Sequence, residues 1–178
     1  MRSMMRQPLF TLACVLLSAC GVSEGGPKTG TPAPRFEAHY VDGSTRRFPE
    51  DFAGRPVIVD FWAEWCQYCP DSMKRLDRAR REHADAGLEV IAVNVGQDHA
   101  TAAAFIDKLE LGYSAVLDPD RSITAQYGVK GLPVSFFIDR NGLIGGRIIG
   151  AGDDKTLAMQ LSRILPNDTV DQSQSAAR

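Results

Sequence analysis

The chain has 178 residues, with 20 Lys and Arg against 22 Asp and Glu, which gives a formal net charge of -2. This balance excludes partners that are bound through charge alone, such as nucleic acid or an anionic surface. The length is sufficient for one domain that buries a full core, so the function must come from a specific site.

The N-terminus has the form of a bacterial export signal. Two arginines precede an apolar run over residues 9–17, which is too short to span a membrane as a helix. The run ends in the sequence LSAC, which resembles the lipobox of bacterial lipoproteins. Residues 1–19 are therefore predicted to be a signal peptide, and Cys20 is predicted to carry lipid after cleavage. An ordinary signal peptide is the alternative.

The predicted location is the cell envelope, facing the periplasm, with the protein held to a membrane by this lipid. Gly21 follows Cys20 at a position where Asp commonly retains lipoproteins at the inner membrane, so the inner and outer membranes both remain open. Residues 20–34 are predicted to be the lipidated end and a flexible tether, because this Gly- and Pro-rich stretch cannot bury a core.

The cysteines divide by position along the chain. Cys14 leaves with the signal peptide and Cys20 is assigned to lipid, so Cys66 and Cys69 are the remaining thiols. Although disulfides can form in an export compartment, one pair at this close spacing does not make a structural disulfide framework.

Residues 35–165 are predicted to form one α/β domain, followed by a disordered tail over residues 166–178. Asp-Gly and Asn-Gly pairs between apolar runs predict two tight hairpins. Two strands of the buried type, joined through a helix, predict a right-handed βαβ unit with parallel strands. The predicted strands are 36–40, 44–48, 57–62, 88–95, 113–117, 134–138 and 143–149, and the predicted helices are 66–86, 101–109, 121–127 and 153–165.

The apolar strand over residues 57–62 leads directly to Cys66 and Cys69 at the predicted start of a helix. A thiol at a helix N-terminus faces unpaired N–H groups and the positive end of the helix dipole, which favour the thiolate. Cys66 is therefore predicted to be the nucleophile. Cys69 lies on the same helix face and is predicted to resolve the mixed disulfide.

Asp60 places a carboxylate inside this apolar strand. If both faces of the strand are covered, as in parallel sheets, burial should raise the pKa of Asp60 towards the range useful for proton transfer. The alternative is an edge-strand Asp that faces water.

The segment from Asp60 to Cys69 resembles the active site of thioredoxin. The order of elements resembles a thioredoxin fold with an N-terminal hairpin and a central helix-strand insertion. These additions are similar to the TlpA/ResA branch, whose members are exported, membrane-tethered thiol-disulfide reductases. The resemblance covers residues 34–165, and its markers are the sequences FWAEWCQYC, IAVNVG, VLDPDR and YGVKGLPVSFFIDRNG.

The resemblance implies roles for residues around the dithiol. Asp60 takes the place of the thioredoxin acid that moves the proton of the resolving thiol. Trp65, Leu132 and Pro133 take the places of substrate contacts. The Leu132–Pro133 bond is expected to be cis, with the backbone of Leu132 pairing with an extended substrate. An ordinary proline at the start of a strand is the alternative.

Two positions depart from the TlpA/ResA pattern. Ser72 stands where that branch often has a glutamate, and Asp60 supplies a strand acid that the branch often lacks. The proton-handling acid is therefore of the thioredoxin type, and a preference for apocytochrome c that depends on the glutamate does not carry over directly.

The sequence predicts a thiol-disulfide oxidoreductase that reduces exported proteins, with apocytochrome c among the candidate substrates and a membrane thiol-transfer protein as electron donor. It predicts no cofactor. A disulfide oxidant or isomerase of the same fold is the alternative. A metal-binding dithiol is a further alternative, although His39, His83 and His99 show no ligand spacing with one another.

Overall fold

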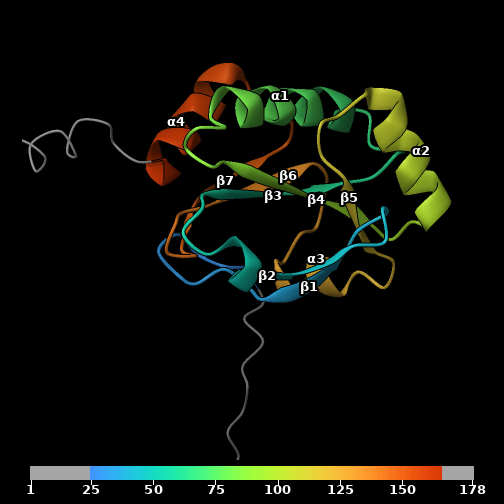
Figure 1. Ribbon diagram of the computed structural model, residues 1–178, viewed down its shortest axis with the longest axis horizontal. Coiled ribbons are helices and arrows are strands. Elements are labelled where there is room, and N and C mark those ends of the chain that lie inside the picture. Colours follow the sequence, from blue (N-terminus) through green and yellow to red (C-terminus); the bar gives the residue numbers. More distant parts are fainter. Residues whose placement is uncertain (1–24, 166–178) are drawn as a thin grey trace, which may run out of the picture.

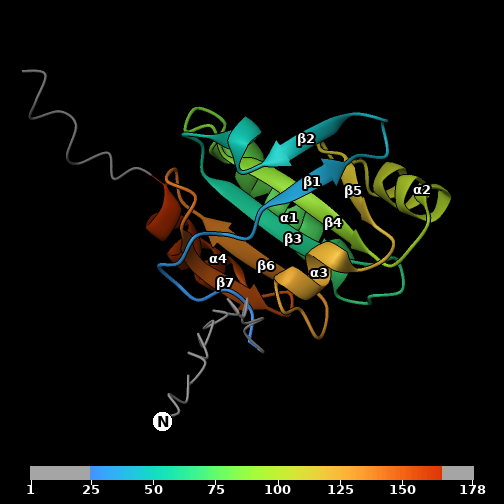
Figure 2. The ribbon, with the colours of Figure 1, turned by 90° about the horizontal axis from the view of Figure 1, so that it is seen from below.

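The structure is a computed structural model that describes residues 25–165. A central five-stranded sheet has the order β5-β4-β3-β6-β7, and β1 and β2 form a separate two-stranded hairpin. The helices α1 and α4 cover one face of the sheet, whereas the hairpin and α3 cover the other (Figures 1 and 2). The strands are β1 (Phe36–His39), β2 (Thr45–Phe48), β3 (Val57–Trp62), β4 (Glu89–Val95), β5 (Ala115–Asp118), β6 (Val134–Ile138) and β7 (Ile144–Ile149), and the helices are η1 (Glu50–Phe52), α1 (Cys69–Glu82), α2 (His99–Leu109), α3 (Ser122–Gln126) and α4 (Asp154–Ile164).

The strand directions confirm the predicted α/β class. β3 pairs parallel with β4, and β4 pairs parallel with β5, whereas β6 and β7 complete the sheet as antiparallel strands. The two predicted hairpins, β1-β2 and β6-β7, both form. Each predicted strand and helix is present, and most of their ends shift by only one or two residues.

β3 lies in the middle of the sheet and is buried along its whole length. Its side chains alternate between the two faces of the sheet. Val57, Val59 and Phe61 belong to the core on the hairpin side. Ile58 and Trp62 belong to the clusters on the side of α1, so Asp60 between them also points to the α1 side.

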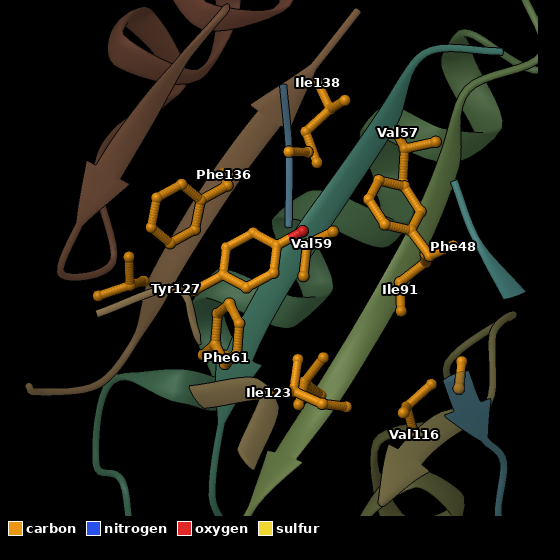
Figure 3. Packing of buried hydrophobic residues seen from close by; sticks show 14 of the residues in the cluster. Phe48, Val57, Val59, Phe61, Ile91, Val116, Ile123, Tyr127, Phe136 and Ile138 are labelled. Atoms are coloured by element: carbon orange, nitrogen blue, oxygen red, sulfur yellow. The ribbon is translucent and has the colours of Figure 1, made fainter. Parts of the chain in front are cut away.

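The core on the hairpin side is built around Tyr127, which follows α3. Its ring centroid lies 5.2 Å from that of Phe61 on β3 and 5.0 Å from that of Phe136 on β6 (Figure 3). The Tyr127 hydroxyl donates a hydrogen bond to the carbonyl of Pro34 at 3.1 Å. This contact fixes the start of the domain to the core beneath β3.

The structure shortens the predicted tether at its C-terminal end. Gly30 donates a backbone hydrogen bond to Ile144 at 2.8 Å, and Ile144 donates to Thr31 at 2.9 Å. Ala33 is buried in the core. The domain therefore begins before Arg35, because this segment satisfies backbone groups at the start of β7. The predicted signal peptide, Cys20 and the tail over residues 166–178 lie outside the described residues.

The structure also corrects the start and end of the first helix. α1 begins at Cys69 rather than at Cys66 and ends at Glu82 rather than near residue 86. Pro70 has no N–H and cannot donate to the Cys66 carbonyl, so a helical bond is first made from Ser72 to Tyr68, at 3.3 Å. Cys66 lies in the turn that precedes the helix.

Candidate active site

The two predicted redox cysteines are joined in a disulfide between the end of β3 and the start of α1. The sulfur atoms are 2.07 Å apart, and the Cα atoms are 5.4 Å apart. Cys66 is 5% exposed, whereas Cys69 is 0% exposed. Cys66 is therefore the more exposed residue of the pair, as expected for the thiol that meets a substrate first.

Two aromatic side chains stand out from the surface beside this disulfide. Trp65 is 64% exposed and Tyr68 is 61% exposed, although both are large and apolar. Exposed aromatic residues next to a reactive group are typical of a surface that binds another protein. The structure thus exposes Trp65, a predicted substrate contact, directly next to Cys66, the predicted nucleophile.

The loop between β3 and the disulfide is held by a contact that the sequence analysis missed. The Gln97 side-chain oxygen accepts a hydrogen bond from the Glu64 backbone N–H at 2.8 Å and another from the Asn94 side chain at 2.9 Å. Asn94 is buried at the end of β4. The sequence signal for this contact was the amide of Asn94 in a strand that is otherwise apolar, because a buried polar group needs a hydrogen-bond partner.

Asp60 is completely buried, which excludes the edge-strand alternative. Its Oδ1 accepts a hydrogen bond from the Ser135 hydroxyl at 2.7 Å, and its Oδ2 accepts none from any residue in the described part of the chain. Burial raises the pKa of Asp60 from 3.8 to about 7, and the bond from Ser135 acts in the opposite direction. The carboxyl therefore titrates near neutral pH.

Ser135 lies directly across from Asp60, where β6 pairs with β3. This serine was not predicted to belong to the site, although it is a polar residue inside a buried strand. Its hydroxyl can donate to either protonation state of the carboxyl, but the bond is stronger to the charged oxygen. Ser135 therefore fixes the orientation of Asp60 and lowers its pKa, against the larger effect of burial.

Tyr113 connects the region around Asp60 with the first turns of α1. The Tyr113 hydroxyl donates to the Met73 carbonyl of α1 at 3.0 Å. Burial, and after it the charge of Asp60, raises the pKa of Tyr113. Met73 and both cysteines share one buried cluster with Trp62. Asp60 thus belongs to the same side of the sheet as the redox pair.

The Leu132–Pro133 peptide bond is cis, as predicted. Pro133 is buried, and Leu132 packs against the cluster that holds both cysteines. Within residues 25–165, the N–H and C=O groups of Leu132 form no backbone hydrogen bond. This backbone is free to pair with an extended chain. The Phe48–Pro49 bond is also cis, which the sequence analysis did not predict.

Between residues 25 and 165, no three His, Cys, Asp or Glu side chains come together in a geometry that would hold a metal ion. No helix in the same range is long and apolar enough to cross a membrane.

Comparisons with known proteins agree on one family. The profile of the AhpC/TSA family matches residues 29–146. The chain is 30% identical over 137 residues to the thiol-disulfide oxidoreductase ResA of Geobacillus thermodenitrificans, covering 77% of this chain and 78% of the relative. It is 31% identical over 135 residues to the thiol:disulfide interchange protein DsbE of Pseudomonas aeruginosa, covering 75% and 73% respectively.

Solved structures give the same result. A thiol:disulfide interchange protein DsbE from Chlorobium tepidum superimposes with a TM-score of 0.71 at 30% identity, covering 78% of this chain and 99% of that one. A protein disulfide isomerase from Bacteroides thetaiotaomicron has a TM-score of 0.73 at 23% identity, covering 80% and 93%, which supports the fold alone.

We expect Asp60 to make the stability of the oxidised protein depend on pH. Between pH 3.8 and about 7, the folded protein retains a proton on Asp60 that the unfolded chain has released. The contribution of Asp60 is therefore complete below the unfolded pKa and is lost as the pH rises through the folded pKa. Urea unfolding at several pH values should show a falling free energy of unfolding, and Asp60→Asn should remove this component.

Two further variants test whether the pH dependence comes from Asp60. Ser135→Ala removes the bond that favours the charged carboxylate, so the loss of stability should extend to higher pH than in the parent protein. Asp71→Asn changes an exposed carboxylate of α1 and should leave the slope over this range unchanged. Equal slopes for the parent and Asp60→Asn would show that Asp60 does not titrate there.

Proposed function

Because this chain belongs to the AhpC/TSA family and carries the Cys66–Cys69 pair of a thiol-disulfide oxidoreductase, we propose that it reduces disulfides in exported proteins. The sequence resemblance to the thioredoxin-like ResA group is confirmed by the relatives. The observation that carries the proposal is the disulfide itself, which joins the slightly exposed Cys66 to the fully buried Cys69 beside exposed aromatic residues.

The reaction begins from the reduced dithiol. The Cys66 thiolate attacks one sulfur of the substrate disulfide, and a Cys66–substrate disulfide forms while the first substrate thiolate leaves. The Cys69 thiolate then attacks the sulfur of Cys66, which forms the observed disulfide and releases the second substrate thiolate. Two electrons pass from the protein to the substrate, and the leaving thiolates take up protons.

Asp60 serves as the acceptor for the proton of Cys69. Cys69 is inaccessible to solvent, so an internal base is needed to produce its thiolate. A carboxyl with a pKa of about 7 exchanges protons readily near neutral pH. Its position on the α1 side of β3, with Ser135 fixing one oxygen, suits this role.

Trp65 and Leu132 form the contact surface for the substrate. The free backbone groups of Leu132 would pair with an extended segment, in the manner of strand addition. The exposed ring of Trp65 would cover the segment on its other side. Pro133 supports Leu132 from within the core.

The reducing direction follows from the electrostatics around the dithiol. Strong stabilisation of the Cys66 thiolate makes a disulfide oxidant, and weak stabilisation makes a reductant. Gln67 and Tyr68, which separate the cysteines, supply no positive charge. Ionised Asp60 behind the pair opposes a second negative charge. Both features favour the disulfide over the dithiol, so a membrane thiol-transfer protein must supply electrons.

The proposed setting is the periplasmic side of the cell envelope, with Cys20 as the lipid anchor. The substrate class is exported proteins that carry unwanted disulfides, with apocytochrome c as one candidate. The lipobox-like sequence at residues 17–20 supports the anchor, and the relatedness to ResA and DsbE supports the redox role.

We expect the two cysteines to fail in different ways when replaced. Cys66→Ser should abolish disulfide reduction, because the accessible nucleophile is lost. Cys69→Ser should attack once and remain bound to its substrate, because the buried resolving thiol is absent. Non-reducing gels after incubation with a disulfide substrate would show the trapped complex. A complex formed through Cys69 in Cys66→Ser would reverse the assignment.

The direction of electron flow is tested by the reduction potential of the pair. Equilibration of the purified protein with glutathione should give a value nearer to about -270 mV than to about -120 mV, which bracket thioredoxin-fold reductants and oxidants. A potential near the oxidant extreme, or faster oxidation of dithiols than reduction of disulfides, would instead support an oxidant or isomerase.

The anchor is tested separately from the chemistry. Cys20→Ser should release the protein from membranes while its reductase activity in solution stays normal, because Cys20 precedes the folded domain. Membrane fractionation and a disulfide-reduction assay measure the two properties. Retention of Cys20→Ser in the membrane fraction would refute the lipid anchor.

A further inference from the structure

A small hollow lies beside the candidate active site. Its volume is about 150 Å³, and Trp65 and Leu132, the predicted substrate contacts, line it together with Val95, Val129, Arg121 and Lys130. Pockets for cofactors and other small ligands usually have volumes of about 300 Å³ or more. This hollow suits one side chain of a larger partner.

The hollow combines an apolar floor with two positive charges. Val95, Val129 and Leu132 supply the apolar surface, and Arg121 and Lys130 supply the charges. In the part of the chain that the structure describes, neither cation forms an ion pair or a side-chain hydrogen bond. The acidic residue next to Trp65, Glu64, does not line the hollow. The charges are therefore available to a bound partner.

The carboxylates nearest to Arg121 along the chain, those of Asp118 and Asp120, already accept hydrogen bonds from other groups. Asp118 accepts hydrogen bonds from the N–H groups of Ile123 and Thr124, at 3.1 and 2.9 Å, and is buried. Asp120 accepts from the N–H of Ser122 at 3.1 Å. Both carboxylates thus stabilise the start of α3, and within residues 25–165 neither forms an ion pair with Arg121.

The backbone holds Arg121 in place beside the hollow. Its φ is 61°, a left-handed conformation that is uncommon for a residue other than glycine. Gly96, at the end of β4, leaves room for its side chain, since a Cβ there would lie 2.6 Å from Arg121 Nε. The guanidinium group therefore lies against Gly96, while Arg121 as a whole remains exposed to solvent.

We propose that this hollow selects substrates by charge: it receives a side chain close to the reacting cysteine, and it favours protein segments that are acidic there. The inference rests on the proposed function, since a substrate bonded to Cys66 and paired with Leu132 must pass Trp65. Aspartate or glutamate at that place meets Arg121 and Lys130, whereas lysine or arginine is repelled. The apolar floor accepts the stem of the same side chain.

The test uses two synthetic disulfide peptides that differ only in having Asp or Lys beside one cysteine. For each peptide, the second-order rate constant for reduction by the reduced protein is divided by the rate constant for reduction of the same peptide by dithiothreitol. This division removes the difference in reactivity that comes from the leaving thiol. We expect the corrected rate for the Asp peptide to be about fivefold higher at low salt and the ratio to fall as salt is added.

Variants of the two cations test whether the preference for the Asp peptide arises in the hollow. Lys130→Glu should reduce the ratio to about one or below, and Arg121→Gln should reduce it in the same direction, while both still reduce an uncharged peptide. Lys155→Glu, an exposed lysine at the start of α4 and outside this hollow, is the matched control and should keep the ratio.

The possible outcomes distinguish a failure of the charge selection from a failure of the proposed reductase function. A ratio of one or less in the parent protein, or a ratio that Lys130→Glu leaves unchanged, would overturn the charge selection while the reductase function stands. If neither peptide were reduced, the proposed function would fail, and the selection would fail with it.

Discussion

The burial of β3 on both faces is the constraint on which the rest of the structure depends. The hairpin and α3 cover one side and α1 covers the other, so no side chain of the strand reaches water (Figure 1). This burial raises the pKa of Asp60, which could not remain at its ordinary value without solvent or a cationic partner. The same strand carries Asp60 and leads into the loop that holds Cys66, so one element positions both the first cysteine and the buried acid that we propose as the proton acceptor for Cys69.

Local patterns were sufficient to predict most of the fold, because they act within a few residues. The apolar run of β3, the Asp-Gly and Asn-Gly turns and the Cys-x-x-Cys spacing each specify their own structure. Contacts between distant segments could not be predicted in this way. The bond from Ser135 to Asp60 and the bonds around Gln97 depend on strand register, which a single sequence does not reveal. The left-handed backbone of Arg121 carries no sequence signal either.

The two boundary errors have a common physical origin in backbone hydrogen bonding. The first helix was expected to begin at Cys66, but Pro70 lacks the N–H that such a start requires. The tether was expected to extend to Pro34, because its composition is that of a linker. Composition indicates only how much apolar surface the side chains can bury. Gly30 and Thr31 are instead held by backbone hydrogen bonds to Ile144, at the start of β7. Backbone pairing therefore ordered a segment that its side chains alone would not.

Charges of opposite sign lie on the two sides of the redox pair, and they act on different partners. Arg121 and Lys130 face solvent, where water and salt weaken their effect on the Cys66 thiolate. Asp60 acts through the low-dielectric interior, where the same charge has a larger effect. We therefore propose that the buried acid acts on the dithiol, whereas the surface cations act on the substrate.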